Sequence, residues 1–260
     1  MSAYLRTRAV VLRHEQPRNA DVRILFLSAA HGKVDAVARG LHLQKSKLAA
    51  SLQPFTVIEA SFVQGRQRRI VTGSIPERLQ VIIRQDPARA FSAGLIVRLA
   101  DLMLPIEQPD AATFELTVDA LEALDRPKVS PQGLNILPYA YAWKLFSRVG
   151  YLPDLATCRV CGQAFATQSL FLDARGGGVI HQTCAANGFI AMPINASIIR
   201  ALLLLTQAPL AEAVRARMST SLQDAIMLVT RSLMEERYDV PMHGSFWTTL
   251  SFVRQPVHET

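Results

Sequence analysis

Apolar and polar positions alternate with a period of two through the first eighty residues, which predicts half-buried β-strands. Five strands are expected, at residues 5–13, 22–28, 33–39, 55–63 and 69–79. His31-Gly32 marks a turn between the second and third strands, and residues 40–54 form a longer connection. Five short strands with a longer excursion after the third are typical of the OB-fold, a barrel that commonly binds single-stranded nucleic acid. A generic small barrel is the alternative.

After residue 87 the apolar positions recur every three or four residues, which predicts amphipathic helices. Helical stripes are expected within residues 88–102, 114–121, 139–149, 198–205 and 222–233. Asn195 is a candidate N-cap for the fourth of these helices. The predicted fold class is therefore α+β, with an N-terminal OB-fold domain at residues 1–82 and a helical domain at residues 83–260.

The most specific local pattern is a pair of short motifs, Cys158-x-x-Cys161 and His181-x-x-Cys184. Two such pairs separated by about twenty residues match the spacing of structural zinc sites. A hairpin through Gly176–Gly178 would bring the pairs together within a zinc-ribbon-like insertion. Three thiolates and one imidazole complete a tetrahedral shell, so one structural Zn²⁺ is expected. The alternative is a set of buried cysteines beside an incidental histidine.

Composition narrows the class of protein further. Half of the 260 residues are hydrophobic and 19% are charged, which excludes a wholly disordered chain. The N-terminus lacks the order of a signal peptide, and no apolar stretch is long enough to span a bilayer. Three cysteines do not make a disulfide framework. A soluble cytoplasmic protein with no membrane partner is expected.

Positive charge is concentrated in the first third of the chain. Residues 1–86 hold 14 Arg or Lys against 6 Asp or Glu, whereas residues 87–260 hold 14 against 15. A basic excess confined to one segment favours a polyanionic partner, with nucleic acid preferred to an anionic membrane surface. The basic side chains on strand faces, in the long connection and in the last hairpin could follow a phosphate backbone. The candidate DNA-binding residues are Arg6, Arg8, Lys33, Arg39, Lys45, Lys47, Arg66, Arg68 and Arg69.

Aromatic residues of this segment are expected to serve the core and not to stack on bases. Tyr4, Phe26, Phe55 and Phe62 occupy strand positions. Binding is therefore expected to be electrostatic and largely independent of sequence.

The sequence contains no recognisable catalytic constellation, so we expect a protein that is not an enzyme. The glycine run at 176–178 lacks the lysine of a phosphate-binding loop, and no G-x-S-x-G elbow occurs. Two alternatives remain open. One is a zinc-ribbon adaptor of transcription or translation whose barrel binds RNA, and the other is a zinc-dependent hydrolase.

Several short motifs accompany this order of barrel, helices and paired cysteines. They are Arg8-Ala9-Val10-Val11-Leu12, Gly32-Lys33, Ala38-Arg39-Gly40, Leu52-Gln53-Pro54-Phe55, Gly150-Tyr151-Leu152-Pro153 and Cys158-Arg159-Val160-Cys161-Gly162. In this order they resemble the RecO family of bacterial DNA repair proteins, over essentially the whole chain.

The resemblance implies a recombination mediator of the RecF pathway. Such proteins bind and anneal single- and double-stranded DNA, contact the C-terminal tail of the single-stranded DNA-binding protein, and act with RecR to load RecA. It implies a cytoplasmic, nucleoid-associated location. It also implies Lys33 and Arg39 as leading DNA contacts, supported by Arg66, Arg68 and Arg69.

The metal motif differs from the common pattern of the family. Zinc-binding members commonly have a second cysteine pair where this chain has His181 and Cys184, and some members lack the site. The resemblance therefore implies that the metal has a scaffold role.

Overall fold

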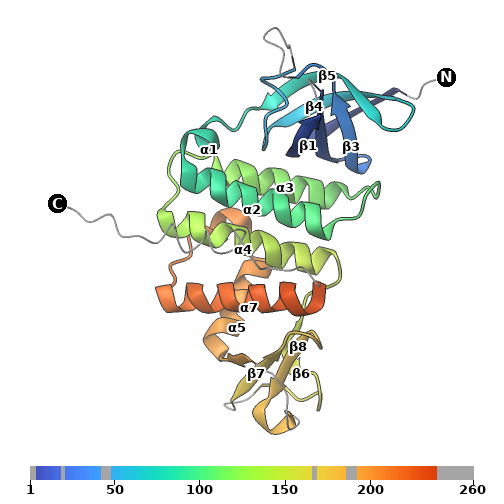
Figure 1. The fold of residues 1–260 in the computed structure, drawn as a ribbon. Helices are drawn as coiled ribbons and strands as arrows, with labels where there is room; N and C mark the ends of the chain where they lie inside the picture. The colour runs from blue at the N-terminus through green and yellow to red at the C-terminus, as the bar shows by residue number, and fades with distance from the viewer. Residues whose placement is uncertain (1–3, 19–20, 42–47, 166–168, 186–191, 239–260) are drawn as a thin grey trace. The chain divides into compact units, whose positions relative to one another are not determined.

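The computed structural model describes residues 4–18, 21–41, 48–165, 169–185 and 192–238. The chain divides into two compact units, Met1–Val129 and Ser130–Thr260. The first unit holds a β-barrel and three helices, and the second holds the remaining helices and a small sheet (Figure 1).

Five strands close into a barrel in the order β1-β2-β3-β5-β4. Their neighbours run antiparallel, except for β3 and β5, which are parallel. This confirms the predicted OB-like arrangement, and closure removes the unpaired edges that an open sheet would expose. The strands are β1 (Tyr4–Arg18), β2 (Asp21–Ser28), β3 (Gly32–Ala38), β4 (Val57–Gln64) and β5 (Arg69–Arg78).

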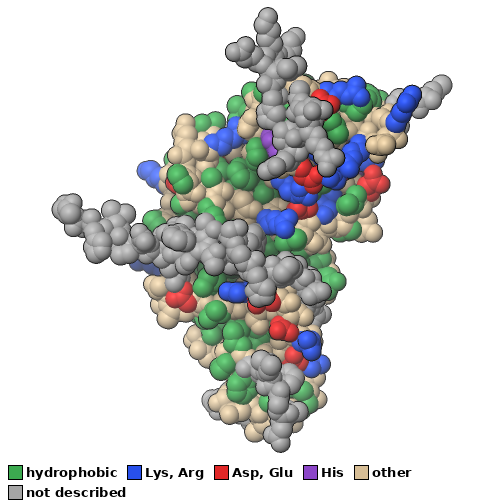
Figure 2. Space-filling model, viewed as in Figure 1, with side chains coloured by type: hydrophobic (Ala, Val, Ile, Leu, Met, Phe, Trp, Pro, Cys, Tyr) green, Lys and Arg blue, Asp and Glu red, His purple; other side chains and the backbone are tan. Residues whose placement is uncertain are grey.

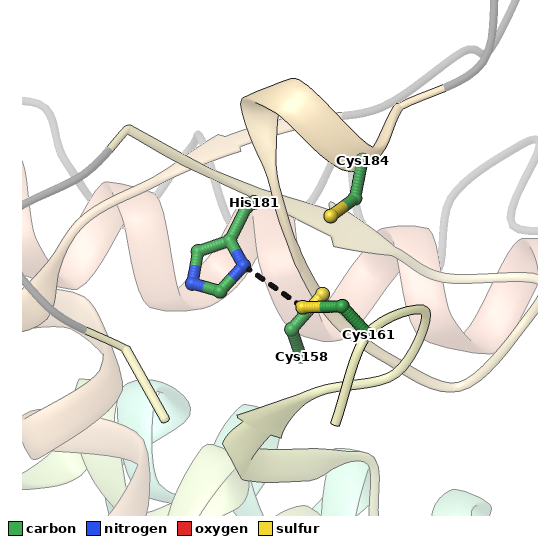
Figure 3. Close-up of side chains that lie close together, drawn as sticks. All are labelled: Cys158, Cys161, His181 and Cys184. Atoms are coloured by element: carbon green, nitrogen blue, oxygen red, sulfur yellow. Dashed lines mark hydrogen bonds between the residues drawn. The ribbon is translucent and has the colours of Figure 1, made fainter. Parts of the chain in front are cut away.

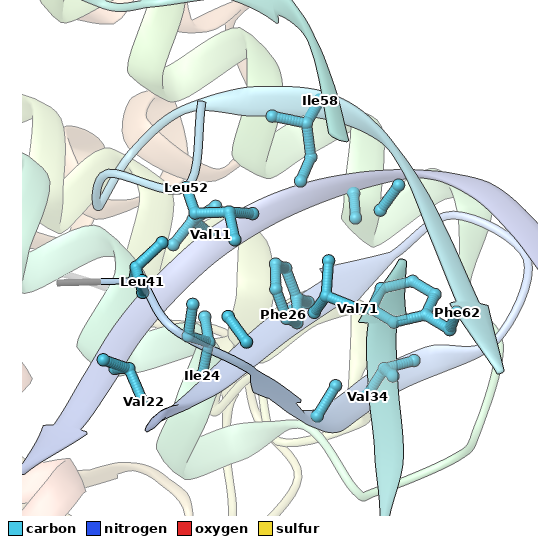
Figure 4. Packing of buried hydrophobic residues seen from close by; sticks show 14 residues of the cluster. Val11, Val22, Ile24, Phe26, Val34, Leu41, Leu52, Ile58, Phe62 and Val71 are labelled. Carbon is cyan, nitrogen blue, oxygen red and sulfur yellow. The ribbon is translucent and has the colours of Figure 1, made fainter. Parts of the chain in front are cut away.

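Alternate side chains of the strands fill the interior of the barrel (Figure 4). Phe26 and Phe62 pack there edge to face, with ring centres 5.3 Å apart, as the sequence predicts. The expectation that Tyr4 belongs to the core is wrong, because its side chain is 64% exposed. Ala9 and Val11 point inward from β1, so the even-numbered position 4 lies on the outer face.

The turn between β2 and β3 depends on Gly32. Its φ of +65° lies in the left-handed region, which glycine adopts without strain. A Cβ at this position would lie 2.1 Å from the carbonyl oxygen of Gln108. The close approach of the segment before α3 therefore requires a residue without a side chain at this turn.

Three helices complete the first unit: α1 (Val81–Gln85), α2 (Pro87–Met103) and α3 (Ala111–Leu124). The Asp86 carboxylate caps α2 by accepting from the Ala88 backbone N–H. Helix α2 contacts β1, and α3 contacts β2. The buried Arg89 guanidinium donates to the carbonyl oxygen of Leu124, so the C-terminal end of α3 is satisfied by α2.

The second unit contains α4 (Pro131–Arg148), α5 (Ala196–Gln207), α6 (Leu210–Ala213) and α7 (Thr220–Tyr238). Helix α4 packs against the other three. The buried Trp143 indole donates to the Thr230 hydroxyl at 2.9 Å. The predicted cap is confirmed, because the Asn195 side chain accepts from the backbone N–H groups of Ser197 and Ile198. None of the helices in the described ranges is long and apolar enough to cross a membrane.

A four-stranded sheet interrupts the helices of the second unit. Its strand order is β6-β8-β7-β9, and the predicted glycine hairpin joins β7 to β8. The strands are β6 (Asp154–Cys158), β7 (Leu170–Asp173), β8 (Gly178–His181) and β9 (Met192–Ile194). This sheet carries both cysteine motifs.

Candidate metal centre and nucleic-acid interface

The four predicted metal ligands meet beside the small sheet (Figure 3). Cys158 ends β6, His181 ends β8, and Cys184 ends the following 3₁₀ turn. Their ligand atoms and that of Cys161 all lie within 4.8 Å of one another. A tetrahedral zinc shell with bonds of about 2.3 Å places its ligands about 3.8 Å apart. The group therefore fits a single metal ion.

Local backbone geometry holds the first cysteine pair. The N–H of Gly162 donates to the Cys158 carbonyl at 2.8 Å, which closes a tight turn. Gly162 has a φ of +72°, a conformation that favours glycine. Across the site, the Phe165 ring packs edge-on against the buried His181 ring, with ring centres 5.6 Å apart. The imidazole is thereby fixed with Nδ1 3.5 Å from the Cys161 sulfur.

The thiols have very different proton affinities. Burial opposes ionisation of Cys158, but hydrogen bonds from the backbone at Cys161, His181 and Val160 lower its pKa to about 6. Partial burial and the neighbouring sulfurs raise the pKa of Cys184 to about 11. Three sulfurs this close cannot all become thiolates without a cation to offset their repulsion. The chemistry of the group therefore suits a bound metal ion.

The predicted arginines of β1 are already engaged by carboxylates. Arg6 Nε lies 2.6 Å from a Glu59 oxygen. Arg8 Nη1 lies 2.7 Å from Glu115, and its Nε lies 2.9 Å from Glu77. Both arginines point outward from the same face of β1, but each has an anionic partner within the first unit.

Lys33 is buried, with only 7% of its surface exposed. Its Nζ donates to the backbone carbonyl of Asp101 at 2.5 Å and lies 3.4 Å from the Asp101 carboxylate. Asp101 lies in the last turn of α2, where carbonyl oxygens lack helical partners. This geometry makes Lys33 a link between the barrel and α2, and its ammonium is not presented to solvent.

The remaining predicted basic residues gather around β3 and the β4–β5 hairpin. Ala36 of β3 pairs with Arg69 of β5, so the hairpin lies beside β3. Arg39, Arg66 and Arg68 are exposed, whereas Arg69 Nη1 binds Glu107 at 2.8 Å. Within the described ranges, neither Arg39 nor Arg66 forms a salt bridge. Lys45 and Lys47 lie outside the described residues.

Arg23 of β2, which the sequence analysis did not single out, links the charged side chains on the outer side of β1, β2 and β3. Its guanidinium binds Asp35 of β3 through two nitrogens and Glu15 of β1 through a third. The turn at Gly32 fixes the hairpin register that places Arg23 opposite Val37, diagonal to Asp35. This register could have identified the pair from the sequence, because it places Arg23 and Asp35 on the same outer face of the hairpin. Basic and acidic side chains are accordingly interleaved over the barrel (Figure 2).

Comparisons with known proteins cover both units. The N-terminal model of recombination protein O matches residues 1–74, and its C-terminal model matches residues 84–245. A DNA repair protein RecO from Cutibacterium acnes is 32% identical over 186 residues, 70% of this chain and 75% of the relative. One from Anaeromyxobacter sp. (strain K) is 31% identical over 209 residues, 78% of this chain and 80% of the relative. The chain belongs to the RecO family of DNA repair and recombination proteins.

Proposed function

We propose that this chain is a non-enzymatic recombination mediator. It binds single- and double-stranded DNA and anneals complementary strands. It contacts the C-terminal tail of the single-stranded DNA-binding protein and acts with RecR to load RecA, in the cytoplasm at the nucleoid. In this proposal residues 1–82 bind DNA, residues 83–260 carry the protein contacts, and residues 151–190 form a metal-stabilised insertion.

The exposed arginines on the barrel carry the DNA-binding part of the proposal. OB-folds bind oligonucleotides on the face of strands 2 and 3 and with the loop between strands 4 and 5. Arg39 directly follows β3, and Arg66 and Arg68 occupy the β4–β5 loop. All three are exposed at the place where this fold class holds its ligand. Contacts from guanidinium groups to phosphates would then supply the affinity.

The other basic residues take supporting roles in this proposal. Arg6, Arg8 and Arg69 contact phosphates only after exchanging a carboxylate partner for DNA. Lys33 holds α2 against the barrel and contributes no direct contact, because its ammonium is buried on Asp101. Lys45 and Lys47 remain candidates from the sequence.

A double variant, Arg39→Glu with Arg66→Glu, tests the DNA interface. It replaces two exposed cations that form no salt bridge with any residue the structure describes, so the dissociation constant for single-stranded DNA should rise by more than about tenfold near 0.1 M salt. Arg200→Glu is a suitable control, because Arg200 is an exposed arginine on α5 of the second unit. Fluorescence anisotropy of a labelled oligonucleotide measures both. Unchanged affinity in the double variant would remove these residues from the interface.

Annealing of two complementary oligonucleotides, each coated with the single-stranded DNA-binding protein, tests the mediator activity. The protein should accelerate annealing without ATP, and the double variant should lose the acceleration. An RNA adaptor or a hydrolase has no reason to pair coated DNA strands. No acceleration at low salt by folded protein would contradict the proposal.

We also propose that Cys158, Cys161, His181 and Cys184 hold one structural Zn²⁺. Four protein ligands leave no open position for a water molecule, so the ion would stabilise the small sheet and perform no catalysis. Protein purified without added metal should contain about one zinc per chain by elemental analysis. Protein that is folded and free of zinc would contradict this assignment.

A further inference from the structure

The proposed DNA-binding face contains carboxylates as well as arginines. Asp35 lies on the outer side of β3, and its oxygens are 2.8 Å from Arg23 Nε and 2.7 Å from Arg23 Nη2. Such a two-pronged contact is also the one that an arginine makes to a phosphate. The same Asp35 carboxylate lies 3.5 Å from Arg68 Nη1 in the β4–β5 loop.

A second carboxylate completes the arrangement from the neighbouring strand. Glu15 of β1 accepts from Arg23 Nη1 and from Arg13 Nη1, the latter at 2.7 Å. The side chains of Arg23 and Arg68 are nevertheless 38% and 44% exposed. Their guanidinium groups can therefore reach a ligand while held by protein carboxylates.

We infer that Asp35, supported by Glu15, limits the affinity of the barrel for DNA by occupying the arginine positions that phosphates would take. The inference rests on the proposed function, since it assumes that this face binds DNA. Bound DNA either replaces Asp35 on Arg23 and Arg68 or contacts these arginines while Asp35 stays paired with them. Both cases weaken binding. In the first, an ion pair is lost for each one gained, and in the second, the carboxylate offsets part of the positive charge that attracts the phosphate.

A restrained affinity suits a protein that must leave the strands it has paired. Ion pairs between partly exposed side chains contribute little to folding stability, because water and salt screen them. The carboxylates can therefore be neutralised without large loss of the fold. Asp35 is thus a residue that sets the affinity for DNA, and its charge can be removed without disrupting the barrel.

Asp35→Asn tests this inference, because it removes the charge and keeps the shape of the side chain. Binding to a labelled single-stranded oligonucleotide should tighten by about three- to tenfold near 0.1 M salt. The slope of log affinity against log salt should steepen by about 0.7, which corresponds to one further phosphate contact. Glu15→Gln should tighten binding in the same direction by a smaller factor, and provides a second variant if Asp35→Asn folds poorly.

Glu235→Gln is the matched control. It also removes one carboxylate and frees one arginine, Arg231, but on α7 of the second unit, which the proposal does not place at the DNA. The affinity of this variant for the oligonucleotide should stay within about twofold of that of the unmodified protein. Equal tightening in Glu235→Gln and Asp35→Asn would overturn the inference, because net charge alone would then explain both.

The Arg39→Glu/Arg66→Glu variant separates failure of this inference from failure of the proposed interface. If that double variant binds weakly while folded Asp35→Asn and Glu15→Gln bind no more tightly than the unmodified protein, Asp35 has no restraining role and the interface stands. If the double variant binds DNA normally, the interface fails, and the inference is overturned with it.

Discussion

The cysteine–histidine group and the charged face of the barrel are built over very different distances along the chain. Cys161 and His181 are 20 residues apart, and each belongs to a pair of ligands within one short turn. On the barrel, Arg8 meets Glu115 from 107 residues away, and Arg6 meets Glu59 from 53 residues away. The cysteine–histidine group is therefore built from residues close in sequence, whereas many ion pairs on the barrel join residues that only tertiary folding brings together.

This difference in sequence distance explains why the sequence located the cysteine–histidine group but did not show which basic residues are paired with carboxylates. Metal ligands are recognised by residue type and spacing, and both are visible in the sequence. The availability of an arginine depends on whether a carboxylate reaches it, which spacing does not reveal. The basic excess of the N-terminal segment consequently overstates the positive charge that the barrel offers to a ligand.

The largest expected effect is the loss of bound zinc when the cysteine–histidine group is disrupted. Cys184→Ser removes one of four ligands, so bound zinc should fall from about one ion per chain to below about 0.1. Elemental analysis measures the metal, and limited proteolysis should show new cleavage within residues 154–194. DNA binding by the separately assembled barrel should change by less than about twofold. His31→Ala, which alters a histidine outside the group, should keep its zinc.

Acid should release the metal from the intact group. Binding requires thiolates and a neutral imidazole, so affinity falls as pH falls. The pKa of Cys184, raised to about 11, means that its thiol releases a proton to the solvent when metal binds at neutral pH. Competition with a chelator should therefore show at least about a tenfold loss of affinity for each pH unit between 8 and 6. A pH-independent affinity would contradict the assigned ligands.

An intermediate effect, on the free energy of unfolding, is expected from a substitution in the hydrophobic core of the barrel. Phe62→Ala removes a fully buried ring that packs on Phe26, so it should lower the free energy of unfolding by about 3–5 kcal/mol. Tyr4→Ala removes an exposed aromatic side chain of the same barrel and should cost less than about 0.5 kcal/mol. Urea denaturation compares the two. Equal losses would contradict the burial of Phe62 on β4 and the exposure of Tyr4 on β1.

The smallest effect should come from a single exposed ion pair. The hydrogen bond from Arg6 lowers the pKa of Glu59, so the pair favours the folded state above the ordinary pKa of a glutamate and loses this contribution in acid. Solvent screens both side chains, which are 57% and 40% exposed. Glu59→Gln should therefore shift the melting temperature at pH 7 by less than about 2 °C. A larger shift would show that this exposed ion pair also stabilises the barrel.

Much of the fold could be predicted because strands and helices leave periodic patterns within short stretches of the sequence. Period-two alternation located the five barrel strands, and three- to four-residue spacing located the long helices from α2 onward. The Asn195 cap and the glycine hairpin between β7 and β8 follow from the properties of individual residues. The short helices α1 and α6 were not predicted, since four or five residues give too little periodicity to recognise.

The sequence by itself determined the fold class and the four members of the cysteine–histidine group, because backbone periodicity and the spacing of residue types act over short stretches. Only the tertiary structure decided which basic residues face solvent. The alternation along β3 places Lys33 outside the barrel, yet α2 covers it, and the Asp101 carbonyl accepts a hydrogen bond from its ammonium. Burial and ion pairing depend on residues distant in sequence, so the same residue type serves as a buried link at Lys33 and as an exposed cation at Arg39.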